Sequence, residues 1–386
     1  MHQRTVGGLA TSAVGFGELR LATADARGVT EIERTLHHAL TSNLSFVEVA
    51  DEEDAEKMVG EAIRGLRLRD SALTATRVPL LAGTRFLDRL PPGHVQQRIE
   101  ATLRATKLDA LPLAMLPLST AWLTSTAWPE LAGTLGKLTR EGKVLRWGVR
   151  LDLVAADREG RLTDELERAA ALRDPFCAIS IALSACDRRG LPLLEGIVMT
   201  APVVKKAKPK STGLLVSLDD VADDPMLDDP ELAAMMGRIP VTPVAGDAER
   251  VKSLQILARE PLAGGVLGGT IGPGMKMSPR DDRRSLDDAM LTKIAIAVGT
   301  LAPLVRDLPP AASSCEAARG AFEQGKRPDH VEAKSIAELA LRFVLDRGAL
   351  ALPRLHKKEY VTTALQAIAA PPLSPDVHER LIAVLS

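Results

Sequence analysis

The stretch GVTEIERTLHHALTSNLSFVEVADEEDAEKMVGEAIRGL, residues 28–66, places one short apolar run between two segments whose apolar residues recur at helical spacing. The spacing predicts a helix over 29–43, the run FVEVA predicts a strand over 46–50, and EKMVGEAIRGL predicts a second helix over 56–66. A strand between two amphipathic helices is the repeating unit of parallel α/β sheets. This stretch therefore indicates an α/β fold.

The same alternation continues on both sides of this stretch. Apolar runs predict further strands over 12–18, 72–78, 111–118, 144–151, 177–185, 253–269 (running into a glycine-rich loop) and 349–353. Helical spacing predicts helices over 94–107, 129–143, 162–172, 286–308, 332–348, 358–370 and from Ser374 onward. Repeated βα units joined by right-handed crossovers close into a barrel when there are about eight of them.

The pattern is interrupted between residues 190 and 245. There an apolar run at 197–204, a basic turn at 205–210 and an acidic, proline-punctuated stretch follow one another. We therefore expect one unit over residues 1–386, a (β/α)8 TIM barrel with an inserted irregular and β segment at 190–245, before strand seven. The lysines of the basic turn either bind an acidic partner or are compensated by the acidic residues that follow.

Composition narrows the classes of partner. The formal net charge is −1, which argues against a nucleic acid or an anionic membrane as partner. The three cysteines form no C-x-x-C pair and no even set, so we expect neither a disulfide framework nor a metal site. The chain shows no signal-peptide pattern and no apolar run long enough to span a bilayer, so we expect a cytoplasmic location.

Several segments resemble the aldo-keto reductase family, and the likeness covers nearly the whole chain apart from the insertion. They are SAVGFGE (12–18), EKMVGEAI (56–63), TREGKVLRWGVR (139–150), AREPLAGGVLGG (258–269) and ALALPRLHKKEYVTTAL (349–365). The resemblance implies a (β/α)8 barrel that binds NADPH and passes hydride to a carbonyl. It also implies a tyrosine that donates the proton, assisted by lysine, aspartate and histidine.

The positions that match this catalytic set hold other residues. Glu48 takes the place of the aspartate, Arg77 that of the lysine and Pro117 that of the histidine. The tyrosine position falls in the acidic run that contains Glu52 and Glu53. The only tyrosine of the chain lies in a predicted helix after the last strand, so no other phenol can replace the missing one. Because Glu48 and Arg77 keep the charges of the residues they replace, we expect an ion pair between them.

The segments that would hold the cofactor depart from the family pattern, most of all at the nicotinamide end. Arg150 and Leu151 occupy the place of the pair that binds the nicotinamide amide, and Arg259 or Glu260 that of a stacking aromatic residue. From this we expect no cofactor, NADPH included. The phosphate end keeps positive charge and predicts an anion site, for a truncated or different ligand, at the start of a helix. Its residues are Arg354, His356, Lys357 and Lys358.

Two functions remain open at this point. The first is a catalytically inactive binding or scaffold module, a pseudoenzyme, for a protein, a peptide or a pathway intermediate held by the barrel mouth and the 190–245 segment. The alternative is an oxidoreductase or other enzyme with altered acid–base chemistry that uses Glu48, Glu52 or Glu53, since barrel active sites lie where strands end. The acidic run 51–56 either binds a cation or is a solvated loop and helix start.

Overall fold

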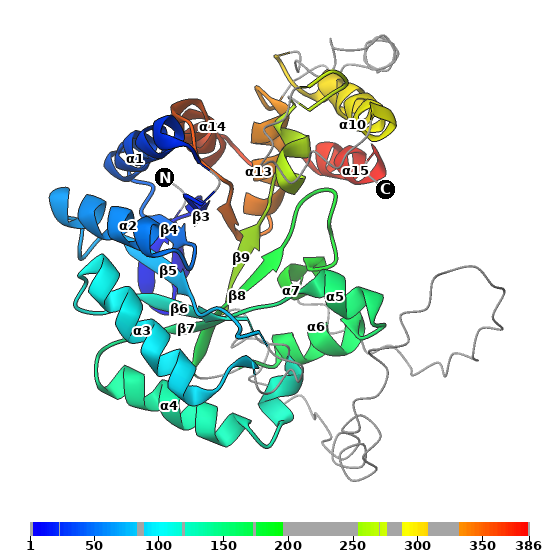
Figure 1. The fold of residues 1–386 in the computed structure, drawn as a ribbon. Helices are drawn as coiled ribbons and strands as arrows, with labels where there is room; N and C mark the ends of the chain where they lie inside the picture. The colour runs from blue at the N-terminus through cyan, green and yellow to red at the C-terminus, as the bar shows by residue number, and fades with distance from the viewer. Residues whose placement is uncertain are drawn as a thin grey trace, which may run out of the picture.

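The computed structural model describes residues 3–22, 24–82, 89–117, 120–172, 175–195, 254–269, 271–275, 288–307 and 332–384. Eight strands form one parallel sheet in which the order in space follows the order in the chain (Figure 1). They are β3 (Phe16–Leu19), β4 (Phe46–Val49), β5 (Leu73–Arg77), β6 (Leu113–Leu116), β7 (Trp147–Arg150), β8 (Phe176–Ala182), β9 (Gln255–Arg259) and β10 (Leu350–Leu352). The predicted (β/α)8 barrel is confirmed.

Helices surround this sheet on its outer side (Figure 1). The α-helices are α1 (Ala26–Thr41), α2 (Glu53–Gly65), α3 (Pro92–Thr106), α4 (Trp128–Arg140), α5 (Leu153–Arg158), α6 (Leu162–Ala170), α7 (Leu191–Glu195), α10 (Asp288–Leu301), α13 (Ile336–Leu345), α14 (Lys358–Ala369) and α15 (Pro375–Val384). Short 3-10 helices are η2 (Thr120–Thr124), η3 (Ala263–Gly268) and η5 (Ala302–Leu304). No helix within the described ranges is long and apolar enough to cross a membrane.

The N-terminal segment differs from the prediction of one strand over 12–18. Residues Gln3–Val6 (β1) and Leu9–Ser12 (β2) form an antiparallel hairpin, and the first barrel strand begins only at Phe16. Val6 is fully buried and belongs to the apolar cluster inside the barrel, together with residues from the first halves of the strands such as Phe46 and Leu73. The hairpin therefore closes the end of the barrel at which the strands begin.

Closure of the sheet depends on contact between the first strand and the last. The backbone N–H of Gly15 donates to the carbonyl of Ala351 at 2.9 Å, and that of Gly17 to the carbonyl of Pro353 at 2.8 Å. A Cβ atom on residue 17 would overlap the carbonyl oxygen of Leu352. Only glycine permits this approach, so Gly17 allows β3 and β10 to join.

We predict that Gly17→Ala prevents closure and lowers stability by several kcal/mol, or abolishes folding, because backbone rather than a movable side chain lies in the way. Gly65→Ala at the end of α2 is the matched control, because no atom lies within 4 Å of its added Cβ. Thermal unfolding of both variants checks this. An unchanged melting temperature in Gly17→Ala would show that the two strands can separate without loss.

The inserted segment lies almost entirely outside the described residues. Within 190–245 the structure describes only residues up to 195, which include the short helix α7. The predicted strand at 197–204, the lysines at 205–210 and the protein or peptide partner assigned to this segment therefore stay predictions.

Helices α2 and α3 are joined by a buried ion pair. Glu56 is 1% exposed and accepts a charge-assisted hydrogen bond from Arg98, and the hydroxyl of Thr102 donates to the same carboxylate oxygen at 2.9 Å. Burial raises the pKa of Glu56 above its usual value, although the Arg98 guanidinium opposes that shift. Glu56 is thus not part of a solvated acidic loop, because α3 covers it.

We predict that Arg98→Met destabilises the protein by about 3 kcal/mol at neutral pH, because it leaves a buried carboxylate without a counter-charge. Loss of Arg98 raises the folded-state pKa of Glu56 further above the unfolded value. A raised carboxyl pKa gives stability that falls as pH rises, so the loss should be larger at pH 8 than at pH 5. Urea unfolding at the two pH values measures this loss of stability. The double variant Arg98→Met with Glu56→Gln should recover part of the lost stability. A loss of stability that does not change with pH would contradict the assignment of a buried ion pair between Glu56 and Arg98.

Candidate active site

Charged side chains form the last interior layer of the barrel, where the strands end. Side chains two positions apart along a strand point to the same side of a sheet. Interior apolar positions such as Phe46, Ala75 and Leu257 are therefore followed on the same side by charged residues. These charged residues are Glu48 on β4, Arg77 on β5, Arg150 on β7, Arg259 on β9 and Arg354 just after β10.

Glu18 lies at the centre of this layer and joins the arginines. Its carboxylate oxygens lie 2.8 Å from Arg20 Nη2, 3.1 Å from Arg77 Nη1 and 3.0 Å from Arg354 Nη2, with Arg150 Nη2 at 4.0 Å. Burial acts to raise the pKa of Glu18, but the surrounding guanidinium groups outweigh it and the pKa is lowered. Glu18 is therefore an ionised acceptor at neutral pH, not a proton donor.

Glu48 is the most deeply buried carboxyl group of the layer, at 2% exposure. One of its oxygens accepts from the backbone N–H of Glu18 at 3.3 Å, and the other lies 4.0 Å from Arg150 Nη1. The predicted ion pair between Glu48 and Arg77 is wrong. Arg77 pairs instead with Glu18 and with Asp51, each at 3.1 Å, because Glu18 enters the layer from β3 and takes that guanidinium.

Arg150 retains unused hydrogen-bonding capacity. Its Nη1 atom is buried and has no hydrogen-bond partner among the described residues. Burial, with repulsion from Arg259 and Arg77, lowers the pKa of Arg150 to about 10, while Glu48 and Glu18 oppose the shift. It still carries a positive charge at neutral pH, and a ligand oxygen would find a desolvated donor there.

The other two predicted glutamates do not enter the barrel. Glu52 accepts from the backbone N–H groups of Leu21 and Ala22 at 2.7 and 3.0 Å, so it holds the loop before α1. Glu53 lies in the first turn of α2, is 71% exposed and pairs with Lys57 at 2.7 Å. Among the described residues no group of three or more His, Cys, Asp or Glu side chains could hold a metal ion.

Neither Pro117 nor the tyrosine supplies a proton donor to this layer. Pro117 directly follows β6, is half-buried and has no donor group. Tyr360 lies on α14, is 38% exposed, and its ring meets that of His356 edge-on at 5.0 Å. The sole phenol of the chain is therefore outside the barrel.

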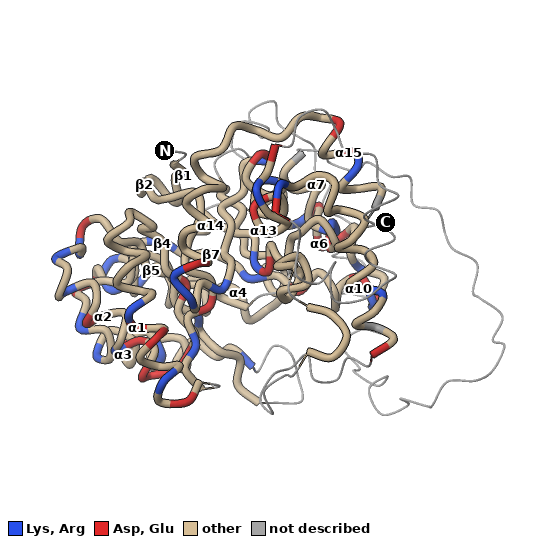
Figure 2. Tube along the Cα trace, turned by 90° about the horizontal axis from the view of Figure 1, so that it is seen from above, with Lys and Arg blue, Asp and Glu red and all other residues tan. Residues whose placement is uncertain are grey.

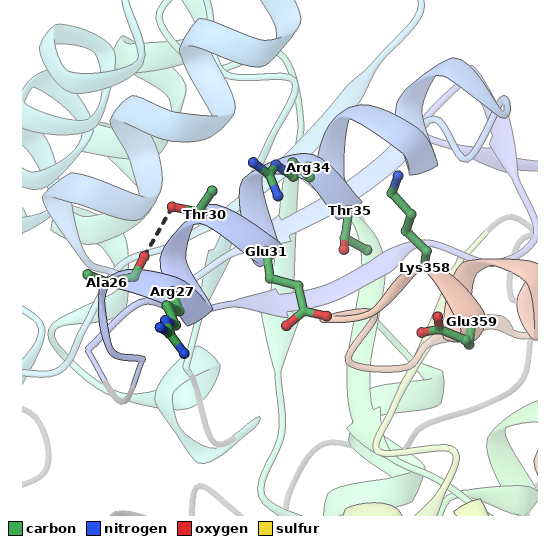
Figure 3. Close-up of a pocket in the computed structure, with 8 residues that line it drawn as sticks. All are labelled: Ala26, Arg27, Thr30, Glu31, Arg34, Thr35, Lys358 and Glu359. Carbon is green, nitrogen blue, oxygen red and sulfur yellow. Dashed lines mark hydrogen bonds between the residues drawn. The ribbon is translucent and has the colours of Figure 1, made fainter.

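The four residues of the predicted anion site point to different places. Arg354 turns into the mouth toward Glu18, His356 contacts Tyr360, and Lys357 is the exposed N-cap residue of α14. Lys358 faces a groove of about 630 Å³ between α1 and α14. Figure 3 shows Lys358 among residues of both signs there, which include Glu31 and Glu359.

Comparison with known proteins gives one curated relative and many solved structures. No family model matches the chain. Methylglyoxal reductase YeaE of Escherichia coli (strain K12) is 30% identical over 156 residues, which are 39% of this chain and 50% of that protein. The chain thus spans half the length of this curated relative.

Similar solved structures cover nearly the whole chain. The glycerol dehydrogenase AKR11B4 from Gluconobacter oxydans has a TM-score of 0.62 at 17% identity, over 99% of this chain and 94% of that one. The holo form of aldo-keto reductase AKR11C1 from Bacillus halodurans has a TM-score of 0.56 at 16% identity, over 100% of this chain and 96% of that one. An aldo-keto reductase from Klebsiella pneumoniae in complex with NADPH has a TM-score of 0.54 at 19% identity, over 100% of this chain and 96% of that one.

The fold is that of the aldo-keto reductases. Two expectations are corrected by these findings. We expected a protein that is not an enzyme, whereas the relatives are named as reductases and a dehydrogenase. We expected no cofactor, whereas the Klebsiella pneumoniae aldo-keto reductase was solved with NADPH. The missing tyrosine removes one proton donor, but it does not decide whether a barrel of this fold holds a nicotinamide.

Sequence reasoning missed Glu18, the residue with most partners in this layer. The available signal was a charged residue that ends a predicted strand, SAVGFGE, directly after the second of its two glycines. Its backbone has a φ of 44°, a value that few side-chain-bearing residues adopt. That conformation belongs to the junction with β10, so it depends on residues more than 300 positions away in the chain.

We predict that Glu18→Gln destabilises the protein by about 3 kcal/mol at neutral pH, because several guanidinium groups lose their shared carboxylate. The lowered pKa of Glu18 means that its contribution is complete above the unfolded pKa and is lost as pH falls through the folded value. The difference between wild type and variant should therefore shrink in acid. Unfolding curves from neutral to strongly acidic pH test this, and a constant difference would contradict it.

Proposed function

We propose that the chain is a nicotinamide-dependent oxidoreductase that reduces a carbonyl compound, with the carboxyl group of Glu48 in the role of proton donor. The observation that carries the proposal is a 2% exposed carboxyl in the last interior layer, 4.0 Å from a guanidinium donor that has no hydrogen-bond partner. The names of the curated relative and of the structural neighbours support the reaction class. Both groups lie where strands end, as barrel active sites do.

The residues fit the phosphate end of a nicotinamide dinucleotide. Lys357 and Lys358 bring positive charge to the start of α14, where free backbone N–H groups also favour phosphate. When bound, the reduced nicotinamide supplies the hydride for the carbonyl carbon.

The chain's own residues then manage the proton and the charge. The Glu48 carboxyl donates its proton to the carbonyl oxygen, which yields an alcohol and leaves Glu48 as a carboxylate. The Arg150 guanidinium, half-buried and therefore little screened by water, stabilises the negative charge that develops on that oxygen. Solvent at the mouth returns the proton to Glu48 before the next turnover.

We predict that the purified protein consumes NADPH or NADH in the presence of methylglyoxal, and that Glu48→Gln lowers kcat about a hundredfold or more. Glutamine keeps the size of the side chain but cannot donate the proton. Cofactor affinity, measured by fluorescence titration, should change little in this variant. Lys357→Met with Lys358→Met should instead weaken cofactor binding.

Glu61→Gln is the matched control, because this glutamate is exposed on α2 and outside the barrel. It should keep full activity. Wild-type protein that binds neither nicotinamide, or Glu48→Gln protein with unchanged kcat, would disprove the assignment.

A further inference from the structure

We infer that the barrel mouth is built to bind an oxyanion group, a carboxylate or a phosphate, carried by the carbonyl substrate. This inference rests on the proposed function and names the substrate class for the same site. The group would lie among Arg150, Arg259 and Arg77, the first two of which have no carboxylate at hydrogen-bond distance among the described residues.

The first argument is the unequal pairing of the arginines. Glu18 serves Arg20, Arg77 and Arg354 at hydrogen-bond distance but lies 4.0 Å from Arg150. Arg150 is equally far from Glu48, so neither carboxylate forms a hydrogen bond with it. Arg20 and Arg77 each have a second carboxylate within 3.6 Å. No carboxylate in the described part of the chain lies that close to Arg150.

Arg259 lacks a carboxylate altogether among the described residues. Its Nη2 donates to the backbone carbonyl of Leu151 at 3.1 Å, which holds the guanidinium beside the end of β7. Its Nε atom is buried without a partner, as is Nε of Arg77. Buried guanidinium donors without acceptors are costly unless something else binds there.

The strand between these two arginines carries small interior side chains beside them. In the register of the sheet, Arg150 pairs with Ser180 on β8, and Ala182 pairs with Arg259. Both β8 residues are small, so two long cationic side chains flank a position without a bulky neighbour. The Ser180 hydroxyl is on the interior side, is 1% exposed, and has no partner among the described residues. This orphaned hydroxyl belongs to the register partner of Arg150.

The electrostatics favour the same occupant. Arg259 and Arg77 repel Arg150, and their charges, after burial, contribute to lowering its pKa. An anion among the three would remove this repulsion and satisfy forked donors that match carboxylate and phosphate geometry. Elsewhere the charges are mixed, since Figure 2 shows Lys and Arg interspersed with Asp and Glu along α1, α2 and α3. Among the charged residues that line the groove of about 670 Å³ between α1 and α2, all but Lys57 are acidic.

The test is equilibrium binding without cofactor or turnover, by calorimetry and by ligand-induced thermal shift. The probes are pyruvate, its neutral analogue pyruvamide, and inorganic phosphate. We expect pyruvate, phosphate or both to bind at least about tenfold more tightly than pyruvamide, the scale of one charge-assisted contact. Preference for pyruvate identifies a 2-oxo acid as substrate, and preference for phosphate identifies a phosphorylated carbonyl compound.

Two variants should move the affinity in opposite directions. Arg259→Met should weaken oxyanion binding about tenfold or more, and Arg259→Lys should recover part of it. Glu18→Gln should strengthen it, because the variant frees guanidinium groups that Glu18 now holds, and the oxyanion should restore part of the lost stability. Arg104→Met, on the exposed side of α3, is the control and should bind as wild type does.

The outcomes separate this inference from the proposed function. Oxyanion binding that depends on Arg259, in a protein that never consumes NADPH, would support the inference and reject the reaction. Reduction of methylglyoxal with no preference for pyruvate or phosphate over pyruvamide would support the reaction and overturn the inference. If Arg259→Met does not fold, Glu18→Gln decides, since unchanged or weaker oxyanion binding in that variant overturns the inference as well.

Discussion

The close backbone contact between β3 and β10 is the constraint on which the rest of the structure depends. Gly17 donates to the carbonyl of Pro353, and its missing side chain leaves space for the carbonyl of Leu352. The residue after each strand contact is charged, Glu18 on one side and Arg354 on the other, and the two meet at 3.0 Å. The junction that closes the barrel therefore also brings the ends of the chain's first and last barrel strands into one charged layer.

That layer is stable because its charges are arranged around a shared acceptor. Several guanidinium groups near one another would repel in a medium with little water. Glu18 offsets this repulsion for Arg20, Arg77 and Arg354, and its own ionised form is favoured in return. Arg150 is left less well compensated, next to the buried Glu48. The part of the layer with the least internal pairing is thus the part that adjoins the proposed proton donor.

Much of the fold followed from local patterns in the sequence, whereas the site followed only in part. Apolar runs and period-3.6 spacing located the eight barrel strands, and the family resemblance singled out Glu48 on the second of them. The partner of Arg77 could not be predicted in this way, because that partner is Glu18, a positive-φ residue on another strand. The acidic run looked uniform in sequence, yet Glu52 binds backbone amides, Glu53 is exposed and Glu56 is buried. Burial and partners depend on tertiary packing, which spacing along the chain does not encode.

The N-terminal hairpin covers the end of the barrel opposite the charged layer. Val6 is buried among the interior apolar residues where the strands begin, so in the described structure the interior is packed at that end. Substrate and cofactor in the proposed reaction therefore approach the site from the end that carries the charged layer. Under the proposed chemistry, whichever molecule is bound deeper cannot leave before the one above it, so the architecture imposes an order on product release.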